Sequence, residues 1–463
     1  MRSKITFGNT VFKQNTNIQT PHKEKNDSAV TEQIYTKKVP TPTLIAYMCA
    51  KNNPDNVNVK FYNSPAINEI CQKYQDIARE VVTELNSRAA QQGQVLNWIK
   101  VLPEAQLQRL DEIYALADSL KHNSAGKLGI IGIGGSKHTV ENLLSLTGNQ
   151  DKAVFLSAVD PDSIDAFIKK LGNPQSAAII VASKSGTTLE PSEGFDTIRK
   201  KLGENFKNYV CITDKDETKS KLRQIANQNG YKCGIIHDEC GGRFGAFDDH
   251  TLTALAYCGM PKDEMKKMLE ASLKAQKKYL SSDIAQNKAL QRALFNTDSV
   301  LKGKNNQYDY YFSDRFNGTA LWNTQLKKES HKSLYKASGD LVGPAFLHNS
   351  TEADLDEGNI SSFYTFNTIK NAGTDEYKAY NALVNGSLKA YSKMHPVSLV
   401  ELKNLSPESI GEFIEMKHFE TIYTGMLLRK ATKNEAESPN VLPEVIQPHV
   451  KIYKNEVEKI LKN

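Results

Sequence analysis

Residues 177–188 read AAIIVASKSGTT, and the change of pattern inside this stretch decides the fold. Six small or β-branched apolar residues are followed by a polar turn that contains Ser183, Lys184, Ser185, Gly186 and Thr188. A short apolar run of this kind is typical of a buried parallel strand. The turn can bind an anion, because glycine lets backbone amides converge and the helix that follows adds a favourable dipole. The same residues would also suit an ordinary turn rich in helix-capping side chains.

Further apolar runs lie on both sides of this strand, with helical stretches between them. We expect strands near residues 128–133, 153–158, 177–182, 209–213 and 234–237. Strands that alternate with helices at this spacing predict a doubly wound parallel sheet, whose ligands bind beyond the carboxyl ends of the strands. Clusters of glycine and polar residues stand at these ends, at residues 134–136, 160–162, 183–188 and 241–243.

The chain has 463 residues, enough for two or three domains, and its patterns divide it into five parts. Residues 1–60 form a polar arm, and residues 61–125 a helical preface with helices over 65–90 and 104–120. Residues 126–260 hold the first α/β unit. Residues 261–435 open with a helical interval, broken at Ser281 and Asn296, and hold a second α/β unit with strands at 310–313, 362–366 and 397–402. Residues 436–463 form a tail with a helix over 450–461.

Composition excludes several classes of protein. Hydrophobic residues make up 39% and charged residues 24% of the chain, as in globular proteins. No apolar run is long enough to cross a bilayer, and the first residues lack the pattern of a secretion signal, so we expect a cytoplasmic protein without a membrane partner. The net charge of +6 is spread along the chain, which does not indicate a nucleic-acid partner. The six cysteines lack the paired spacing of a zinc site, so we predict no metal.

Two glycine motifs at predicted strand ends are candidates for ligand contact. GIGGS at 132–136 includes Gly135 and Ser136 and lets the backbone approach a ligand closely. It lacks the third glycine of a dinucleotide-binding fingerprint, although an acidic residue, Asp160, follows the next strand. GGRF at 241–244 places Arg243 where its guanidinium could stabilise an oxyanion or simply cap a surface turn.

Three later segments carry single candidate side chains. Gln325 and Glu329 are four residues apart, hence on one face of a helix, near the C-terminal end of the helix expected over 319–328, where a glutamate is usually only solvated. His348 follows a glycine-containing loop, and a lone histidine is more often structural than catalytic. Gln447 and Lys454 lie in QPHVKIYK, where the terminal helix begins, and a lysine there normally lies on a solvated face.

Taken in order, these motifs resemble those of the glucose-6-phosphate isomerase (phosphoglucose isomerase) family. The resemblance covers roughly residues 60–463 and rests on GIGGS, DPDS, SKSGTT, GGRF, QLKKES, a downstream histidine and QPHVKIYK. It implies an α/β fold of two doubly wound parallel-sheet domains of the sugar-isomerase (SIS) type, with a helical segment before them and a helix after them. It also implies a glycolytic and gluconeogenic enzyme that interconverts glucose 6-phosphate and fructose 6-phosphate through a cis-enediol(ate), without a cofactor.

The resemblance also assigns roles to individual residues. Glu329 matches the base that moves a proton between C1 and C2, and Arg243 matches the arginine that steadies the enediolate. His348 and Lys454 match the pair associated with ring opening, and the family forms homodimers in which the histidine enters the partner's site. The residues that match the substrate-binding positions are Gly135, Ser136, Ser183, Lys184, Ser185, Thr188, Gln325 and Gln447.

The chain departs from the family pattern at several places. Lys137 and His138 follow GGS where Leu-Gly is common, and Pro191 replaces a hydroxyl just beyond SKSGTT. The residues around His348 also differ, so His331 is a second candidate for ring opening. Two other functions stay open: a bifunctional phosphoglucose/phosphomannose isomerase, and a non-catalytic phosphosugar-binding SIS protein, which would need SKSGTT but not Glu329.

Overall fold

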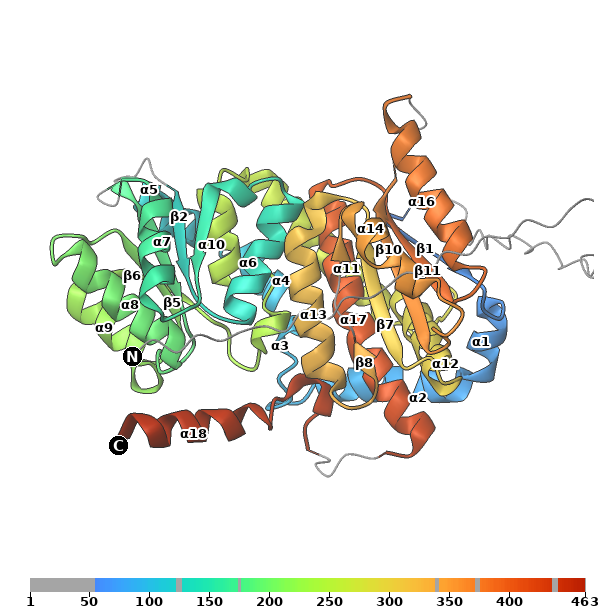
Figure 1. Cartoon of the computed structure of the whole chain (residues 1–463). Helices are drawn as coiled ribbons and strands as arrows, with labels where there is room; N and C mark the ends of the chain where they lie inside the picture. The colour runs from blue at the N-terminus through green and yellow to red at the C-terminus, as the bar shows by residue number, and fades with distance from the viewer. Residues whose placement is uncertain are drawn as a thin grey trace, which may run out of the picture. The chain divides into compact units, whose positions relative to one another are not determined.

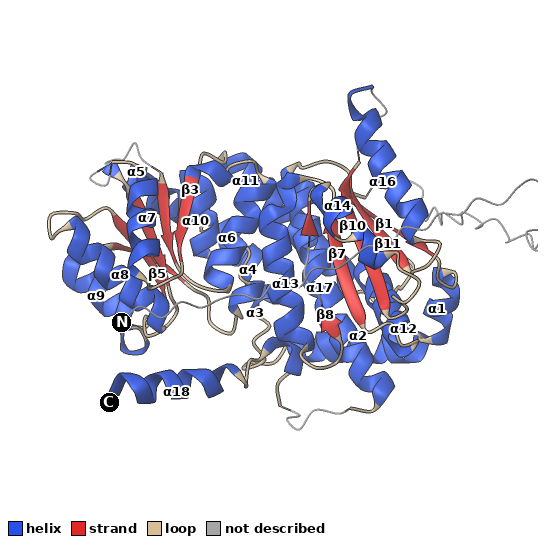
Figure 2. Cartoon of the chain, viewed as in Figure 1, coloured by secondary structure: helices blue, strands red, loops and turns tan. Residues whose placement is uncertain are grey.

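The computed structural model describes residues 55–121, 127–173, 176–337, 341–370, 375–434 and 440–462 (Figure 1). Its strands fall into two groups, and helices flank each of them (Figure 2). Both groups consist mainly of parallel strands, so the predicted α/β class is confirmed. Most of the predicted N-terminal arm lies outside the described residues.

The first sheet has five parallel strands in the order β3-β2-β4-β5-β6. They are β2 (Leu128–Ile131), β3 (Ala153–Leu156), β4 (Ala178–Ala182), β5 (Tyr209–Thr213) and β6 (Lys232–Ile235), which confirms all five predicted strands. All residues of β4 are buried, as expected for an apolar run without alternation. The order reverses direction between β2 and β4, and parallel sheets bind ligands at such a switch point. The turns after these two strands carry GIGGS and SKSGTT.

Helices cover both faces of this sheet. They are α5 (Leu110–Lys121), α6 (Gly135–Leu146), α7 (Pro161–Leu171), α8 (Leu189–Leu202), α9 (Lys221–Asn229) and α10 (Asp249–Tyr257). Their starts have clear local causes: the Asp160 side chain caps α7 by accepting from the Ser163 amide at 2.9 Å, and Ser220 caps α9. The GGRF motif forms a short 3-10 turn, η4 (Gly242–Phe244), between β6 and α10.

The second sheet has the order β1-β11-β10-β7-β8, with β9 also paired to β7. Its strands are β1 (Val57–Tyr62), β7 (Asn306–Tyr311), β8 (Lys336–Ala337), β9 (Leu341–Val342), β10 (Ser362–Ile369) and β11 (Val397–Leu402). β1 pairs antiparallel with β11, so that Val57 lies opposite Leu402. Residues 57–60 therefore belong to the second sheet, although the sequence placed them in the polar arm. The remaining domain boundaries stay predictions.

The remaining helices come from three parts of the chain. Near the N-terminus are α1 (Ile67–Lys73), α2 (Gln75–Ala89), α3 (Asn97–Lys100) and α4 (Leu102–Gln108). In the middle are α11 (Lys262–Tyr279), α12 (Lys288–Leu301) and α13 (Asn317–His331). Later follow α14 (Ala345–Asn349), α15 (Thr351–Asp354), α16 (Lys378–Tyr391), α17 (Pro407–Thr432) and α18 (Val450–Lys462).

The helix break predicted at Asn296 is wrong. α12 continues through this residue, because the Asn296 side chain donates inside the protein to Glu420 Oε1 at 3.1 Å and to Thr424 Oγ1 at 3.3 Å, both on α17. α17 is buried along most of its 26 residues. The amide nitrogen of a residue that looks like a helix breaker in the sequence is here hydrogen-bonded to two side chains of another helix.

α13 connects the two sheets structurally, since it packs against α6 on one side and α17 on another. Its C-terminal half carries Gln325 and Glu329, and α6 begins at Gly135. This packing brings α13 next to the GIGGS turn at residues 132–136, which follows β2 of the first sheet. Within the described ranges, no helix is both long and apolar enough to cross a membrane.

Candidate active site

The turn after β4 is held in shape by hydrogen bonds between its own residues. Ser183 is buried, and its Oγ accepts from the Gly186 amide at 3.2 Å. Ser185 Oγ accepts from the Thr187 amide at 3.2 Å and lies 2.7 Å from the Thr187 hydroxyl. Gly186 has φ +65°, and a Cβ on it would lie 2.3 Å from the Leu222 amide nitrogen. Only glycine fits this position, so the turn shape that the sequence suggested has a specific steric cause.

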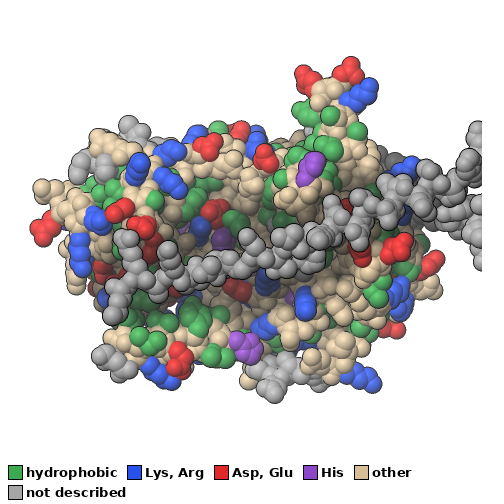
Figure 3. All heavy atoms as spheres, viewed as in Figure 1, with side chains coloured by type: hydrophobic (Ala, Val, Ile, Leu, Met, Phe, Trp, Pro, Cys, Tyr) green, Lys and Arg blue, Asp and Glu red, His purple; other side chains and the backbone are tan. Residues whose placement is uncertain are grey.

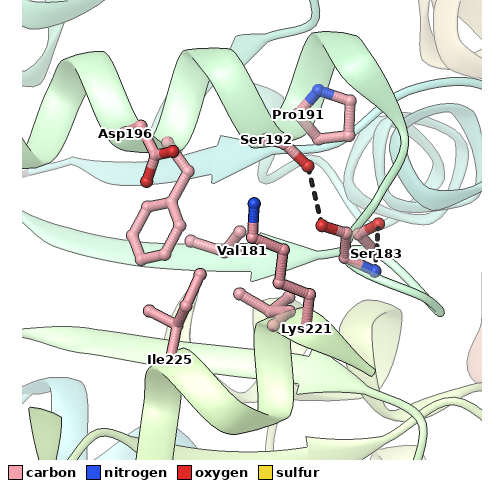
Figure 4. Close-up of a pocket in the computed structure, with 10 residues that line it drawn as sticks. Val181, Ser183, Pro191, Ser192, Asp196, Lys221 and Ile225 are labelled. Carbon is pink, nitrogen blue, oxygen red and sulfur yellow. Dashed lines mark hydrogen bonds between the residues drawn. The ribbon is translucent and has the colours of Figure 1, made fainter. Parts of the chain in front are cut away.

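The back of this turn is closed by the first turn of α8 (Figure 4). Ser192 Oγ donates to the Gly186 carbonyl at 2.9 Å, and Pro191 lies in the first turn of the helix, where a missing amide hydrogen costs no helical bond. The cavity behind the turn measures about 10 Å³, which is room for one water at most. Pro191, a departure from the family pattern, lines this cavity between the turn and α8.

The other predicted residues of this region lie around the turn. Thr188 is the N-cap residue of α8, but its side chain makes no capping bond. Lys184 is exposed, and its Nζ lies 3.6 Å from Asp238. Lys137 and His138 both pair with Glu141 on α6, with His138 Nδ1 at 2.8 Å from its Oε2. The two residues that depart from the family pattern after GGS thus contact the same carboxylate on α6.

The GIGGS turn lies between the SKSGTT turn and α13. A Cβ on Gly132 would lie 3.3 Å from the Ala182 carbonyl at the end of β4, and also 3.3 Å from Cβ of Ser136. A Cβ on Gly134 would lie 3.0 Å from Nε2 of Gln325 on α13. The predicted hydroxyls of Ser136 and the 183–188 turn and the predicted residues of α13 therefore border the same edge of the first sheet.

Gly135 brings the GIGGS and GGRF motifs into direct backbone contact. A Cβ on Gly135 would lie 2.1 Å from the carbonyl carbon of Gly242 and 2.5 Å from the amide nitrogen of Arg243. No side chain can stand between these two turns. The position of Arg243 is thus tied to the turn at the end of β2.

Arg243 is buried and held on every side. Its Nη1 donates to Glu329 Oε2 at 3.1 Å, its Nε to Ser330 Oγ at 3.1 Å, and its Nη2 to the Glu444 carbonyl at 2.5 Å. The Trp322 indole donates to the Arg243 carbonyl at 2.8 Å. Burial lowers the pKa of Arg243, and the Glu329 carboxylate opposes this shift. The alternative of a surface arginine that caps a turn is excluded by this burial.

The Glu329 carboxylate accepts hydrogen bonds from three side chains, and these four residues form the Glu329 cluster. Besides Arg243, it accepts from Nε2 of Gln325 at 2.8 Å and from Nε2 of Gln447, which comes from the tail. The Glu329 side chain is 26% exposed, whereas the Arg243 side chain is 1% exposed. A carboxylate that is fixed by donors and still open to solvent can reach a bound molecule. Arg243, Gln325, Glu329 and Gln447, named from the sequence, are thus brought together by the fold.

His348 and Lys454 are not part of this cluster in the single chain. His348 is exposed on α14, and Lys454 is exposed on α18. His331 does not support the alternative histidine assignment, because it is 1% exposed and its Nε2 donates to the Thr421 carbonyl at 2.9 Å. α18 also exposes the apolar side chains Ile452, Tyr453, Ile460 and Leu461, and Figure 3 shows apolar side chains at the surface over this helix.

Sequence reasoning missed several residues that support the cluster. Ser330 and Trp322 hold Arg243; Ser330 ends the QLKKES motif but was assigned no role, and the only sequence signal of Trp322 is its position on the same helix as Glu329. Lys332 ends α13 with φ +52°, and its Nζ donates to the Pro443 carbonyl. Burial and the nearby Arg243 lower the pKa of Lys332 to about 8. Burial raises the pKa of Glu444, which faces Arg429.

One group among the described residues has metal-ligand spacing: His237, Asp248 and Asp249. Its oxygens already have partners, since Asp248 Oδ1 accepts from His237 Nδ1 at 2.7 Å and Asp249 accepts from both terminal nitrogens of Arg109. These contacts assign the group a structural role between β6 and α10.

Comparison with known proteins places this geometry in context. The family model described as phosphoglucose isomerase matches residues 122–343, a segment that contains Glu329 but ends before His348, Gln447 and Lys454. The chain is 26% identical over 328 residues to a glucose-6-phosphate isomerase of Caldanaerobacter subterraneus subsp. tengcongensis, covering 66% of this chain and 70% of that protein. Alignments with other curated relatives cover as little as 56% of the relative.

Solved structures share the fold. A hypothetical protein from Thermus thermophilus superposes with a TM-score of 0.76 at 20% identity, covering 88% of this chain and all of that one. A glucose-6-phosphate isomerase from Chlamydia trachomatis gives a TM-score of 0.71 at 14% identity and covers 88% of each chain. At these identities the likeness is one of fold, and it extends over both sheets.

Proposed function

We propose that the chain is an aldose–ketose isomerase that interconverts D-glucose 6-phosphate and D-fructose 6-phosphate, because residues 122–343 match the family model described as phosphoglucose isomerase. The observation that carries the proposal is the cluster on Glu329, where one carboxylate is hydrogen-bonded by Arg243, Gln325 and Gln447. A solvent-open carboxylate beside a buried guanidinium is the arrangement that proton transfer next to a carbonyl requires.

In the proposed reaction Glu329 is the base. It takes the proton from C2 of the open-chain aldose, and the C1 carbonyl oxygen gains the negative charge of the cis-enediolate. The protonated Glu329 then delivers its proton to C1, while the proton of the C2 hydroxyl passes to the C1 oxygen and a ketone forms at C2. The guanidinium of Arg243 stabilises the charged intermediate, because it is fixed beforehand by Ser330 and by the Glu444 carbonyl.

The phosphate of the substrate binds in the 183–188 turn. Ser183, Ser185 and Thr188 supply hydroxyls together with Ser136, and Lys184 adds charge nearby. The N-terminus of α8 faces this turn, since Thr188 is its N-cap residue. Gly135 keeps the backbone close to the sugar, and Gln325 and Gln447 line its reacting end. The substrate is thereby held at one end and converted at the other.

Ring opening is assigned to His348 and Lys454, which are both exposed and both stand outside the Glu329 cluster. We propose a homodimer in which each chain supplies His348 to the site of the other. Lys454 comes from the tail that also carries Gln447. The proposed setting is the cytoplasm. A sensor that only binds phosphosugars is disfavoured, because binding alone gives no reason for the hydrogen bonds that converge on Glu329.

The decisive experiment measures turnover of glucose 6-phosphate by the purified chain in a coupled assay, with mannose 6-phosphate in a parallel reaction. We expect conversion of glucose 6-phosphate, and turnover of mannose 6-phosphate would identify the broader isomerase. Glu329→Gln should abolish exchange of the C2 proton with solvent and leave binding of the sugar phosphate intact. A wild-type chain that does not convert glucose 6-phosphate would refute the proposal.

A further inference from the structure

The segment that carries Gln447 is held in place by an unusual buried side chain. Residues 440–447 lie between α17 and α18 and contain one short 3-10 turn, η7 (Pro443–Val445). Leu442 and Val445 are buried in the main core, as apolar residues should be. Glu444 between them is fully buried as well. A carboxylate removed from water in this way requires a specific partner.

That partner is Arg429 in the last turn of α17. Its Nε donates to Glu444 Oε1 at 2.6 Å. The carboxylate reaches it through a notch in the helix, because residue 425 is glycine: a Cβ there would lie 2.5 Å from Cγ and 2.6 Å from Oε1 of Glu444. Glycine is unfavourable inside a helix, so the close approach of Glu444 gives its presence in α17 a physical reason.

The backbone around Glu444 extends this attachment to the Glu329 cluster. The Pro443 carbonyl accepts from Lys332 at the end of α13, and the Glu444 carbonyl accepts from Arg243. Three residues further along the chain, Gln447 donates to Glu329. The segment therefore meets α17 through a side chain and meets α13 and Arg243 through carbonyls.

We propose that Glu444 is a positioning residue for the isomerisation: its insertion beside Gly425 and its ion pair with Arg429 fix residues 443–447, so that Gln447 stays on Glu329 and the Glu444 carbonyl stays on Arg243. The inference rests on the proposed function, and it adds two residues, Glu444 and Arg429, that need not touch the substrate. The phosphate turn at 183–188 makes no part of this attachment.

This separation predicts which kinetic constant changes. If the segment is released, Glu329 loses a donor and Arg243 loses a fixed acceptor, while the phosphate still binds at the turn after β4. Misplacement of reacting groups by about 1 Å costs on the order of 100-fold in rate. We therefore expect kcat to fall roughly 10- to 100-fold and KM to stay near its wild-type value.

Two variants and a control test the proposal. Glu444→Gln keeps the shape of the side chain but removes its charge. Gly425→Ala keeps both charges but fills the notch. Lys430→Ala is the matched control, because Lys430 is next to Arg429 on α17 but pairs with Glu80 and Glu84 on α2 at 3.6 and 3.4 Å. For each protein, kcat and KM are measured, together with amide hydrogen exchange in residues 440–447 and in β4.

The proposal predicts faster exchange in residues 440–447 and a lower kcat for Glu444→Gln and Gly425→Ala, with β4 and the Lys430→Ala control unchanged. Wild-type exchange in residues 440–447 of both test variants would overturn it, as would faster exchange with an unchanged kcat. The two measurements also separate this inference from the proposed function. An inactive wild-type chain would refute the isomerase proposal. Amide hydrogen exchange in residues 440–447 would still test whether Glu444 holds the segment in place. If Glu444→Gln fails to fold, Gly425→Ala carries the test.

Discussion

Replacing Gly135 by alanine should separate two turns that now touch through their backbones. The new Cβ would lie 2.1 Å from the carbonyl carbon of Gly242, whereas ordinary contact begins at about 3.4 Å. The two backbones must therefore part by at least about 1 Å, and the amide nitrogen of Arg243, at 2.5 Å, must move with them. A displacement of this size costs on the order of 100-fold in kcat/KM. Overpacking of a buried contact costs about 1–3 kcal/mol of stability.

The assay is the coupled isomerase reaction, with thermal unfolding measured on the same samples. Gly386→Ala on α16 is the matched control, because no heavy atom lies within 4 Å of a Cβ built there. That control should keep full activity and gain roughly 0.5–1 kcal/mol from the better helix propensity of alanine. If Gly135→Ala keeps the wild-type kcat/KM and melting temperature, the contact does not position Arg243 and the reasoning fails.

Three further outcomes are expected. Arg243→Lys should lower kcat by roughly 100- to 1,000-fold with little change in KM, because an ammonium cannot reproduce three fixed donors; steady-state kinetics checks this. Gly186→Ala should raise KM for the sugar phosphate, because the new Cβ would collide with Leu222 and distort the turn. Isothermal titration calorimetry should show weaker binding of inorganic phosphate, and an unchanged phosphate affinity would contradict this prediction. Burial lowers the pKa of His331 from its ordinary 6.5 to about 4. Between these values the unfolded chain binds a proton that the folded chain does not, so stability falls as pH falls. From pH 7 to 4.5 the free energy of unfolding should fall by about 2 kcal/mol because of His331. Urea unfolding at both pH values should show that the His331→Gln variant does not have this contribution.

Much of the first sheet could be predicted because its strands are short, wholly apolar and bounded by turn residues. β5 has the predicted bounds, and the other four strands overlap their predicted ranges. The second sheet was harder to predict. β1 was missed because it is a single short segment beside a polar stretch and its partner strand, β11, lies more than three hundred residues later. The false break at Asn296 arose because local propensity does not show a buried acceptor on another helix.

The parts of the candidate site that could be predicted are those in which the interacting residues lie close together in the sequence. Gln325 and Glu329 are four residues apart on a helix, and their side chains meet as this spacing predicts. Arg243 could be named as a candidate from its place at a predicted strand end, but its pairing with Glu329, like that of Gln447, joins distant parts of the chain and was implied only by the family resemblance. Glu444 had no signal at all: a glutamate among apolar residues becomes meaningful only when the notch at Gly425 is seen.

The antiparallel pairing of β1 with β11 has a consequence for the solution behaviour of shortened chains. β1 covers one edge of β11, whose sequence VSLVEL contains four valine or leucine residues. A chain that began after Tyr62 would leave the amide and carbonyl groups of that edge unpaired, and such an edge recruits strands from other molecules. β1 is itself the edge strand of this sheet, but its Lys60 is exposed, and a charged side chain on an edge strand opposes such pairing. We therefore expect loss of β1 to increase aggregation at high concentration even if every group around Glu329 is intact.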